Sequence, residues 1–268
     1  VCGGTATGAG MQQEIKAEED SRVNSYEIFV NQKQTHIRNS RGVDVTFSGF
    51  DCEIEVVTNS RKDDHEIEIY KDLRFSDKSA EKIIAEVRGM FHTGRQRLNA
   101  VPTRQNEHAD VLLTGNAVGS FFQYFAMHTN ASYQYMGVAK AKIGEAITGA
   151  DADPLNIRLV PTLDGSAKNA PYDETGMPVA ERVLFENGIC RSYWGSLQHA
   201  HYIGMKNTTS MNNMVVEGGS KTLDELRSMR FPAKTGNENV DEGYRLLATY
   251  LSNTWDNSVT DLAIDYVR

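Results

Sequence analysis

The chain has 268 residues, of which 40% are hydrophobic and 24% are charged, and its formal net charge is −8. This composition is that of a folded globular protein, and the length suffices for one large domain or two small ones around a sizeable core. It excludes a disordered chain, and the acidic balance disfavours a nucleic-acid-binding role, which depends on neutralising phosphates.

The first 25 residues show little periodic hydrophobicity. Residues 1–10 are small and uncharged, and residues 11–25 are polar and charged without a regular pattern. We therefore expect residues 1–25 to form a flexible leader or linker. Because the chain begins with Val1, we also expect it to be a fragment or a processed product.

The region after this leader alternates apolar and polar residues, which predicts strands with one buried and one solvated face. The predicted strands cover residues 26–38, 43–56 and 66–70, and the cluster of turn-forming residues at 39–42 separates the first two. The spacing of apolar residues then changes to that of a helix between residues 80 and 91, with Ser76 or Asp77 as its cap and Gly94 as its end.

The second half of the chain mixes short strands and helices. Strands are predicted near 110–113, 157–160, 183–185, 189–194 and 211–217, and helices near 118–125, 222–229 and 240–251. Asn187-Gly188 predicts a tight hairpin turn, since both residues tolerate positive φ. The sequence thus predicts an α+β fold with curved, largely antiparallel sheets and a few packed helices. We expect one such domain over residues 26–230, followed by a divergent helical segment over 231–268.

Candidate chemical residues are few and weakly patterned. His65-Glu66 lacks the second histidine of a zinc-binding helix and lies in a strand pattern. His199 and His201 would share a face on a strand and could then approach one metal, although a polar segment leading into a helix or turn is the simpler interpretation. Asp173-Glu174 could act in acid–base chemistry if buried, but the sequence that follows is typical of a turn.

The three cysteines are widely spaced and form no CxxC pair, which favours a reduced compartment and disfavours a zinc or thioredoxin-type site. Cys52 alternates with apolar residues and is expected in the core. From the residues alone, the sequence predicts no catalytic residues, no metal site and no cofactor.

Several short motifs resemble, in order and spacing, those of the TldD/PmbA family, whose members are also called modulators of DNA gyrase. The resemblance covers residues 26–226, and its motifs lie at 39–42, 108–113, 142–145, 172–178, 183–189, 200–210 and 218–226. One departure is Thr175, which separates Glu174 from Gly176. The family includes a metallopeptidase subunit with a helix-borne HExxxH, but the corresponding helix here, at 119–128, has no Glu after a His and no second His.

The resemblance therefore implies the other subunit type, PmbA or TldE, which lacks the metal. It implies the C-terminal portion of such a subunit, in a cytoplasmic homo- or hetero-oligomer with a TldD-like metallopeptidase subunit that handles unfolded peptides. No nucleic-acid or membrane partner is expected. The candidate substrate-binding residues are Asp173, Glu174, Asn187, His199 and His201.

Two alternatives remain open. One is a self-sufficient metal-dependent hydrolase built on His199, His201 and the Asp173-Glu174 pair. The other is a protein-binding module without chemistry. Bound metal together with peptide cleavage by the chain alone would favour the hydrolase. Assembly with a metallopeptidase would favour the subunit over the protein-binding module.

Overall fold

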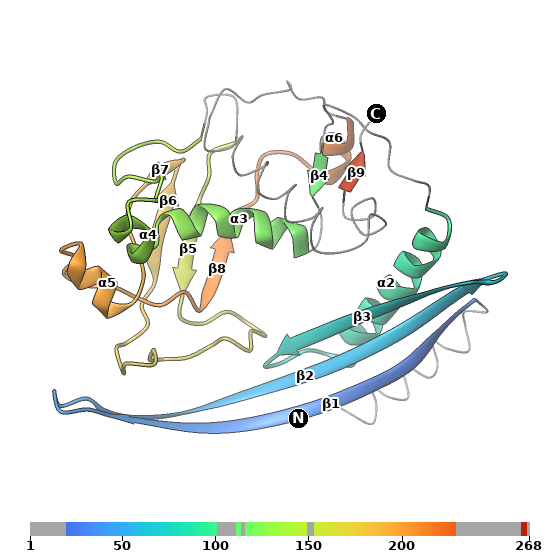
Figure 1. Ribbon diagram of the computed structural model, residues 1–268, viewed down its shortest axis with the longest axis horizontal. Coiled ribbons are helices and arrows are strands. Elements are labelled where there is room, and N and C mark those ends of the chain that lie inside the picture. The colour runs from blue at the N-terminus through green and yellow to red at the C-terminus, as the bar shows by residue number, and fades with distance from the viewer. Residues whose placement is uncertain (1–19, 101–110, 114–115, 149–152, 229–263, 267–268) are drawn as a thin grey trace. The chain divides into compact units, whose positions relative to one another are not determined.

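The computed structural model describes residues 20–100, 111–113, 116–148, 153–228 and 264–266 (Figure 1). The chain divides into two compact units. Unit 1 comprises residues 1–102 together with 162–170, and unit 2 comprises 103–161 and 171–268. Each unit has its own sheet and its own apolar core.

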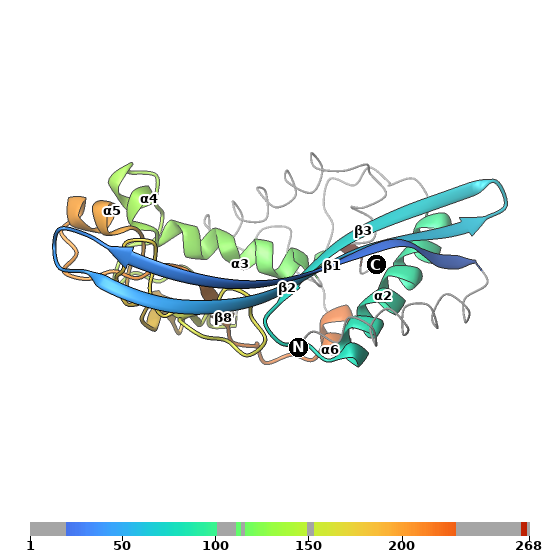
Figure 2. The same ribbon diagram turned by 90° about the horizontal axis from the view of Figure 1, so that it is seen from below.

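Unit 1 is built on a long antiparallel sheet with the order β1-β2-β3 (Figure 2). Its strands are β1 (Ser21–Arg38), β2 (Asp44–Lys62) and β3 (His65–Phe75). The register is set at the β1–β2 turn, where the Asn39 side chain accepts hydrogen bonds from the N–H groups of Arg41 and Val43, at 2.9 and 3.2 Å. These bonds make an Asx turn that leads directly into β2.

Helix α2 (Ala80–Leu98) covers one face of this sheet (Figures 1 and 2). It begins at Ser79, whose hydroxyl accepts from the N–H of Lys82, rather than at the predicted Ser76 or Asp77. Alternate residues of β2 meet one stripe of the helix, and the fully buried members of this core include Cys52, Ile54, Val56, Val87 and Phe91. Burying each large apolar side chain contributes about 1.5–3 kcal/mol, so this contact holds unit 1 together.

Unit 2 contains a small antiparallel sheet with the order β7-β6-β5-β8. Its strands are β5 (Ile157–Val160), β6 (Arg182–Glu186), β7 (Ile189–Cys190) and β8 (Asn213–Val216). A second, two-stranded sheet pairs β4 (Val111–Leu113) with β9 (Ile264–Tyr266). The helices are α3 (Asn116–His128), α4 (Ala131–Tyr135), α5 (Leu197–Tyr202) and α6 (Leu223–Ser228).

Helix α3 supplies the helical side of the unit 2 core. Phe125 and Ala126 are buried against the four-stranded sheet, where Ile157, Leu184 and Phe185 are almost completely buried. Phe121, Phe122 and Phe125 contact one another edge-on or tilted, with ring centroids 5.3–6.4 Å apart. The aromatic spacing that predicted a helix near 118–125 therefore reflects a real core contact.

The predicted α+β class with largely antiparallel sheets is confirmed. Within the described residues, no helix is both long and apolar enough to cross a membrane. The predicted domain 26–230 includes parts of both units. Most of the predicted helical segment 231–268, including the helix near 240–251, lies outside the described residues.

Several element boundaries differ from the prediction, and the contacts explain three of them. β1 begins at Ser21, inside the expected leader, because the Ser21 hydroxyl lies 2.8 Å from that of Ser60 and extends the strand pair. Gly94 lies inside α2 rather than at its end, and Asn99 caps the helix. β7 ends at Cys190, short of residue 194, because Trp194 turns away to bond with the segment between α3 and α4.

Candidate functional site

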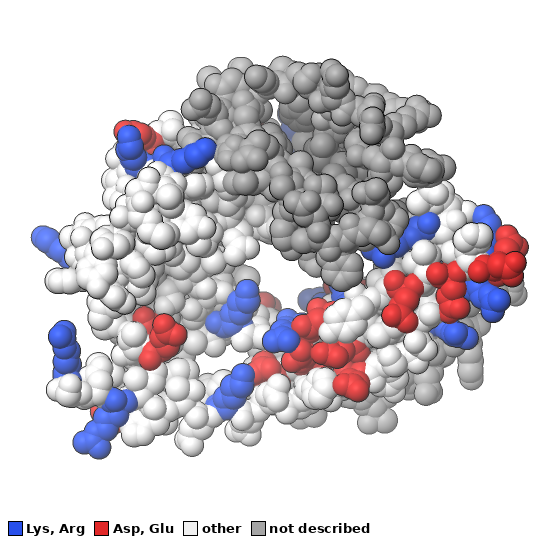
Figure 3. Space-filling model, viewed as in Figure 1, with Lys and Arg blue, Asp and Glu red and all other residues white. Residues whose placement is uncertain are grey.

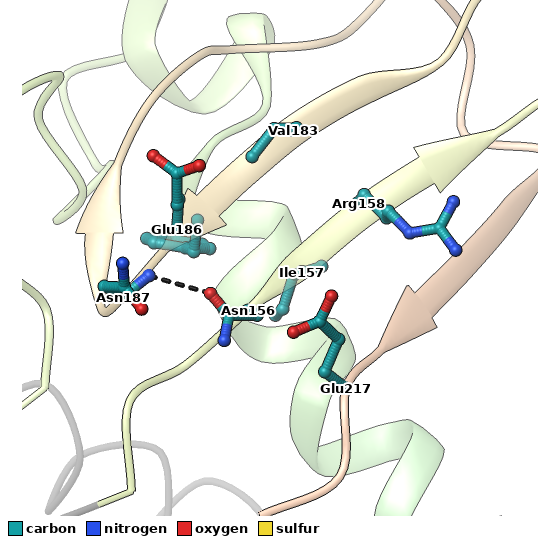
Figure 4. A pocket seen from close by; sticks show the side chains of 8 residues that line it. Asn156, Ile157, Arg158, Val183, Glu186, Asn187 and Glu217 are labelled. Carbon is teal, nitrogen blue, oxygen red and sulfur yellow. Dashed lines mark hydrogen bonds between the residues drawn. The ribbon is translucent and has the colours of Figure 1, made fainter.

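Unit 2 contains a polar cleft of about 280 Å³ at one end of its sheet (Figure 4). The register between β5 and β6 shifts between Ile157 and Arg158, which is the mark of a β-bulge and bends the strand beside the cleft. The cleft is lined by Asn156, Ile157, Arg158, Val183, Phe185, Glu186, Asn187 and Glu217.

The hairpin turn between β6 and β7 forms one wall of this cleft. Asn187 and Gly188 have φ values of 51° and 76°, as the predicted type I′ turn requires. The backbone N–H of Asn187 donates to the side-chain oxygen of Asn156 at 2.8 Å (Figure 4). Gly188 donates to the Leu155 carbonyl at 2.9 Å, so the turn is fixed against the segment that leads into β5.

The cleft carries charges of both signs. Arg158 pairs with Glu181 at 3.2 Å, and Glu186 pairs with Arg191 at 3.0 Å. Glu217 has no ion pair with any described residue, and its N–H donates to the Asn156 carbonyl at 3.1 Å. Two asparagines and a carboxylate offer donors and acceptors suited to a peptide backbone, whereas the described part of the chain has no group of three His, Cys, Asp or Glu residues placed to hold a metal.

Asp173 is occupied by its own turn. One oxygen of its carboxylate accepts from the backbone N–H of Thr175 at 2.8 Å, from the Thr175 hydroxyl at 2.7 Å and from the N–H of Met177 at 3.0 Å. Thr175, which departs from the family motif, therefore adds a bond to this turn. Glu174 is exposed. The carboxylate of Asp173 thus closes an Asx turn. The described contacts of Asp173 and Glu174 provide no buried carboxylate pair for acid–base chemistry.

His199 and His201 lie on α5, which is a helix, so the strand on which they would have shared a face is not formed. Residues two apart on a helix are separated by about 200° around its axis and cannot turn toward one metal. The ring of His199 lies 2.9 Å from the hydroxyl of the capping Ser196 and contacts the rings of Tyr135 and Tyr202, each at a centroid distance of 6.0 Å. His201 is exposed.

His128, at the end of α3, is a buried structural residue. Its Nδ1 accepts from the N–H of Lys140 at 3.2 Å, and its ring contacts those of Tyr124 and Tyr133 at centroid distances of 4.4 and 5.8 Å. This arrangement fixes the loop after α4 to the end of α3. The histidine therefore has a packing role in the structure.

Comparison with known proteins finds a family match for part of the chain. The profile of the PmbA/TldA metallopeptidase C-terminal domain matches residues 106–230. These residues include the cleft and the helices α4 and α5, which carry Tyr135 and His199. Residues 106–230 therefore resemble the C-terminal domain of the PmbA/TldA family. No match is found among curated proteins.

Solved structures with a similar fold carry names from the TldD/PmbA family. TldE from Thermococcus kodakarensis is 18% identical, with a TM-score of 0.66 over 82% of this chain and 52% of that one. Two proteins described as modulators of DNA gyrase, from Thermotoga maritima and Bacteroides thetaiotaomicron, are each 17% identical, with TM-scores of 0.61 and 0.63. Both alignments cover 83% of this chain, and 53% and 51% of those chains, so this chain spans about half the length of these relatives.

Several polar residues of the cleft and its surroundings could not be predicted from the sequence. Asn156, Arg158 and Glu217 reach the cleft from β5 and the end of β8, and no local motif marks them. Arg182 donates to the Tyr193 carbonyl at 3.1 Å and to the Asn207 side chain at 2.8 Å, and burial lowers its pKa. These partners are brought together only by the folded sheet, so no sequence pattern could have found them.

Proposed function

We propose that this chain acts as a non-catalytic, TldE/PmbA-like subunit or homologue in a peptidase assembly that handles unfolded peptides. The observation that carries the proposal is a metallopeptidase-family domain at residues 106–230 without the family's HExxxH, which occurs nowhere in the sequence. The partner would be a TldD-like metallopeptidase subunit, which supplies the metal and the hydrolysis. The assembly would be cytoplasmic, without nucleic-acid or membrane partners.

The polar cleft supports a role in holding peptide. A peptide backbone offers alternating donors and acceptors, and the Asn156, Asn187 and Glu217 side chains supply matching groups beside two apolar ones, Ile157 and Val183. β8, which immediately precedes Glu217, is at the edge of its described sheet. An edge strand can accept an added strand from an extended peptide.

The contacts of the candidate residues argue against the self-sufficient hydrolase. Asp173 is used by a turn, and the two histidines of α5 cannot turn toward one metal. A hydrolytic site would need a nucleophile or metal with an oriented general base within hydrogen-bond reach. Among the described residues, Asp173, His199 and His201 make no such contact with one another.

The test is co-purification and cleavage. The full chain would be purified alone and together with the TldD-like metallopeptidase from the same genome, and zinc content, assembly mass and cleavage of an unfolded polypeptide would be measured. We expect a stable complex that cleaves faster than the metallopeptidase alone, and no cleavage by this chain alone. A metallopeptidase whose HExxxH Glu is replaced by Gln is the matched control, and its complex should assemble without cleaving.

Two outcomes contradict the proposal. Stoichiometric zinc together with cleavage by the chain alone would establish the hydrolase interpretation. A chain that neither assembles with the metallopeptidase nor changes its rate would leave the protein-binding module without chemistry as the better interpretation.

A further inference from the structure

Helices α4 and α5 carry aromatic side chains that contact one another at the surface. Tyr135, Met136 and Tyr202 are each more than half exposed, at 57, 58 and 51%. We call this surface the α4–α5 patch, and its members are the mutually contacting rings of Tyr135, His199 and Tyr202 together with Met136, which follows Tyr135 in the chain. Exposed apolar clusters of this kind mark interaction sites in folded proteins, because burying them against a partner is favourable.

The two helices that carry the patch are held rigidly together. The N–H of Ala131 donates to the Trp194 carbonyl at 2.7 Å, and the N–H of Trp194 donates to the Thr129 carbonyl at 3.1 Å. Gly195 has a φ of 149°, and a Cβ there would lie 3.0 Å from that of Ala131, so the close approach of the two segments requires glycine. Asn130 and Ser196 cap α4 and α5 through their side chains.

The aromatic rings of the patch support one another. Tyr135 and Tyr202 lie 5.0 Å apart between centroids, and His199 packs 6.0 Å from each. The Tyr202 hydroxyl accepts from the side-chain amide of Gln198 at 2.8 Å. Rings fixed in this way lose little conformational entropy when a partner binds, which is why tyrosines are effective anchors at interfaces.

The chain segments that carry the patch are basic, whereas the whole chain is acidic. Residues 116–144 and 187–216 contain four Lys or Arg and no Asp or Glu, although the chain has a net charge of −8. Arg191 and Lys142 are paired with Glu186 and Glu145, whereas Lys140 and Lys206 form no ion pair with a described residue. The surface over α4 and α5 shows no acidic side chain in Figure 3.

We propose that the α4–α5 patch binds peptide segments that combine carboxylates with aromatic or aliphatic side chains. Apolar side chains would cover the rings and Met136, and the carboxylates would complement Lys140 and Lys206, which follow Tyr135 and Tyr202 by five and four residues in the chain. Two unpaired lysines are few for nucleic acid, whose binding requires several phosphate contacts, and Met136 fits side chains better than bases. The inference rests on the proposed peptide-handling role for its ligand class and assigns it a second contact surface outside the cleft.

The test uses the full chain alone and fluorescence anisotropy at low ionic strength. The probe is a short fluorescein-labelled peptide in which Glu alternates with Leu and Tyr. A twin with Lys in place of Glu tests the charge, and a twin with Ser in place of Leu and Tyr tests the apolar contact. We expect the first peptide to bind and both twins to bind at least about tenfold more weakly.

The variants localise the binding. Tyr135→Ser should weaken binding about fivefold or more, while Tyr135→Phe, which keeps the ring, should bind like the parent. Tyr70→Ser is the matched control, because Tyr70 is 55% exposed in unit 1 and pairs across strands in an acidic region. It should leave binding unchanged, and circular dichroism should show that all three variants are folded.

Several outcomes would overturn the proposal. They are equal binding of the Lys twin, equal loss in Tyr70→Ser, tighter binding of a single-stranded oligothymidine, and self-association that Tyr135→Ser abolishes in the absence of peptide binding. Because no metallopeptidase is present, failure here is separate from failure of the assembly test. A chain could assemble with its partner and still not bind these peptides.

Discussion

Replacing Gly94 by Ala should loosen unit 1, although alanine is the better helix former. Gly94 is buried where α2 crosses β2, and a Cβ at this position would overlap the hydroxyl of Ser60 and lie 2.8 Å from the Ser60 Cβ. Ordinary carbon contacts are 3.5–4.0 Å, so either the Ser60 side chain or the helix must move. Rotating Ser60 would break its buried 2.8 Å hydrogen bond with Ser21.

The magnitude follows from three contributions. Overpacking costs about 1–3 kcal/mol, and loss of the Ser21–Ser60 bond costs about 0.5–1.5 kcal/mol. Alanine in place of glycine in a helix returns about 1 kcal/mol. Gly89 on the same helix is exposed, and a Cβ there would have nothing within 4 Å. Gly89→Ala should therefore show only the stabilisation from the higher helix propensity of alanine. The gain is common to both variants, so they should differ in the free energy of opening by about 1.5–4.5 kcal/mol.

The assay is native-state hydrogen exchange followed by mass spectrometry on peptides that cover residues 52–60 of β2. A difference of about 2 kcal/mol corresponds to about thirtyfold faster exchange in Gly94→Ala than in Gly89→Ala. Adding Ser60→Gly to Gly94→Ala should recover part of the loss, because it removes both clashing atoms and makes the two changes non-additive. Equal protection in the two alanine variants would refute the close packing of α2 on β2.

Three further predictions concern unit 2. Asp173→Ala should destabilise the turn by about 1 kcal/mol in urea unfolding, whereas Asp173→Asn keeps the accepting oxygen and should be mild; a catalytic carboxylate would instead lose activity in both variants. Burial raises the pKa of Cys190 to about 11 from 9.0, so the folded state retains the proton. The stability that the buried Cys190 thiol contributes is complete below about pH 9 and is lost as the pH rises toward 11. Thiol-reagent labelling mapped to Cys190 should be slow at pH 8 until the chain is unfolded. Fast labelling of the folded chain would contradict the burial of this thiol. Trp194→Phe removes the 2.8 Å hydrogen bond from the indole to the Ala126 carbonyl. The loss of unfolding free energy in urea should be only about 1 kcal/mol, because the Thr129 hydroxyl still donates to that carbonyl. No change in stability would show that the indole hydrogen bond contributes nothing.

Much of the secondary structure follows from the sequence because its causes are local. Alternation through Cys52, Ile54 and Val56 predicts the buried face of β2, and Asn187-Gly188 predicts the turn that the backbone adopts. Element ends are less predictable, because they depend on distant partners. Ser21 extends β1 by meeting Ser60, and Gly94 continues α2 because β2 approaches it there.

The candidate site was harder to predict, because its residues are joined only by tertiary contacts. Trp194 bonds to Ala126, which is 68 residues away, and Arg182 bonds to Asn207, which is 25 residues away. Neither pair leaves a periodic signal. Tyr135 and Tyr202 are apolar residues on short helices, and the sequence alone gives no reason to expect them to remain exposed.

The candidate binding and catalytic residues that the sequence suggested have structural roles in the fold. Asp173 closes a turn, Asn187 adopts the positive φ of a hairpin, and His199 packs between two tyrosines beside its helix cap. The features without such an explanation are surfaces, namely a polar cleft beside an edge strand and an aromatic patch free of acidic residues. Catalysis requires groups held against one another, whereas binding requires groups held toward solvent. The described part of this chain has the second kind of arrangement, which is the arrangement that the proposed peptide-holding role requires.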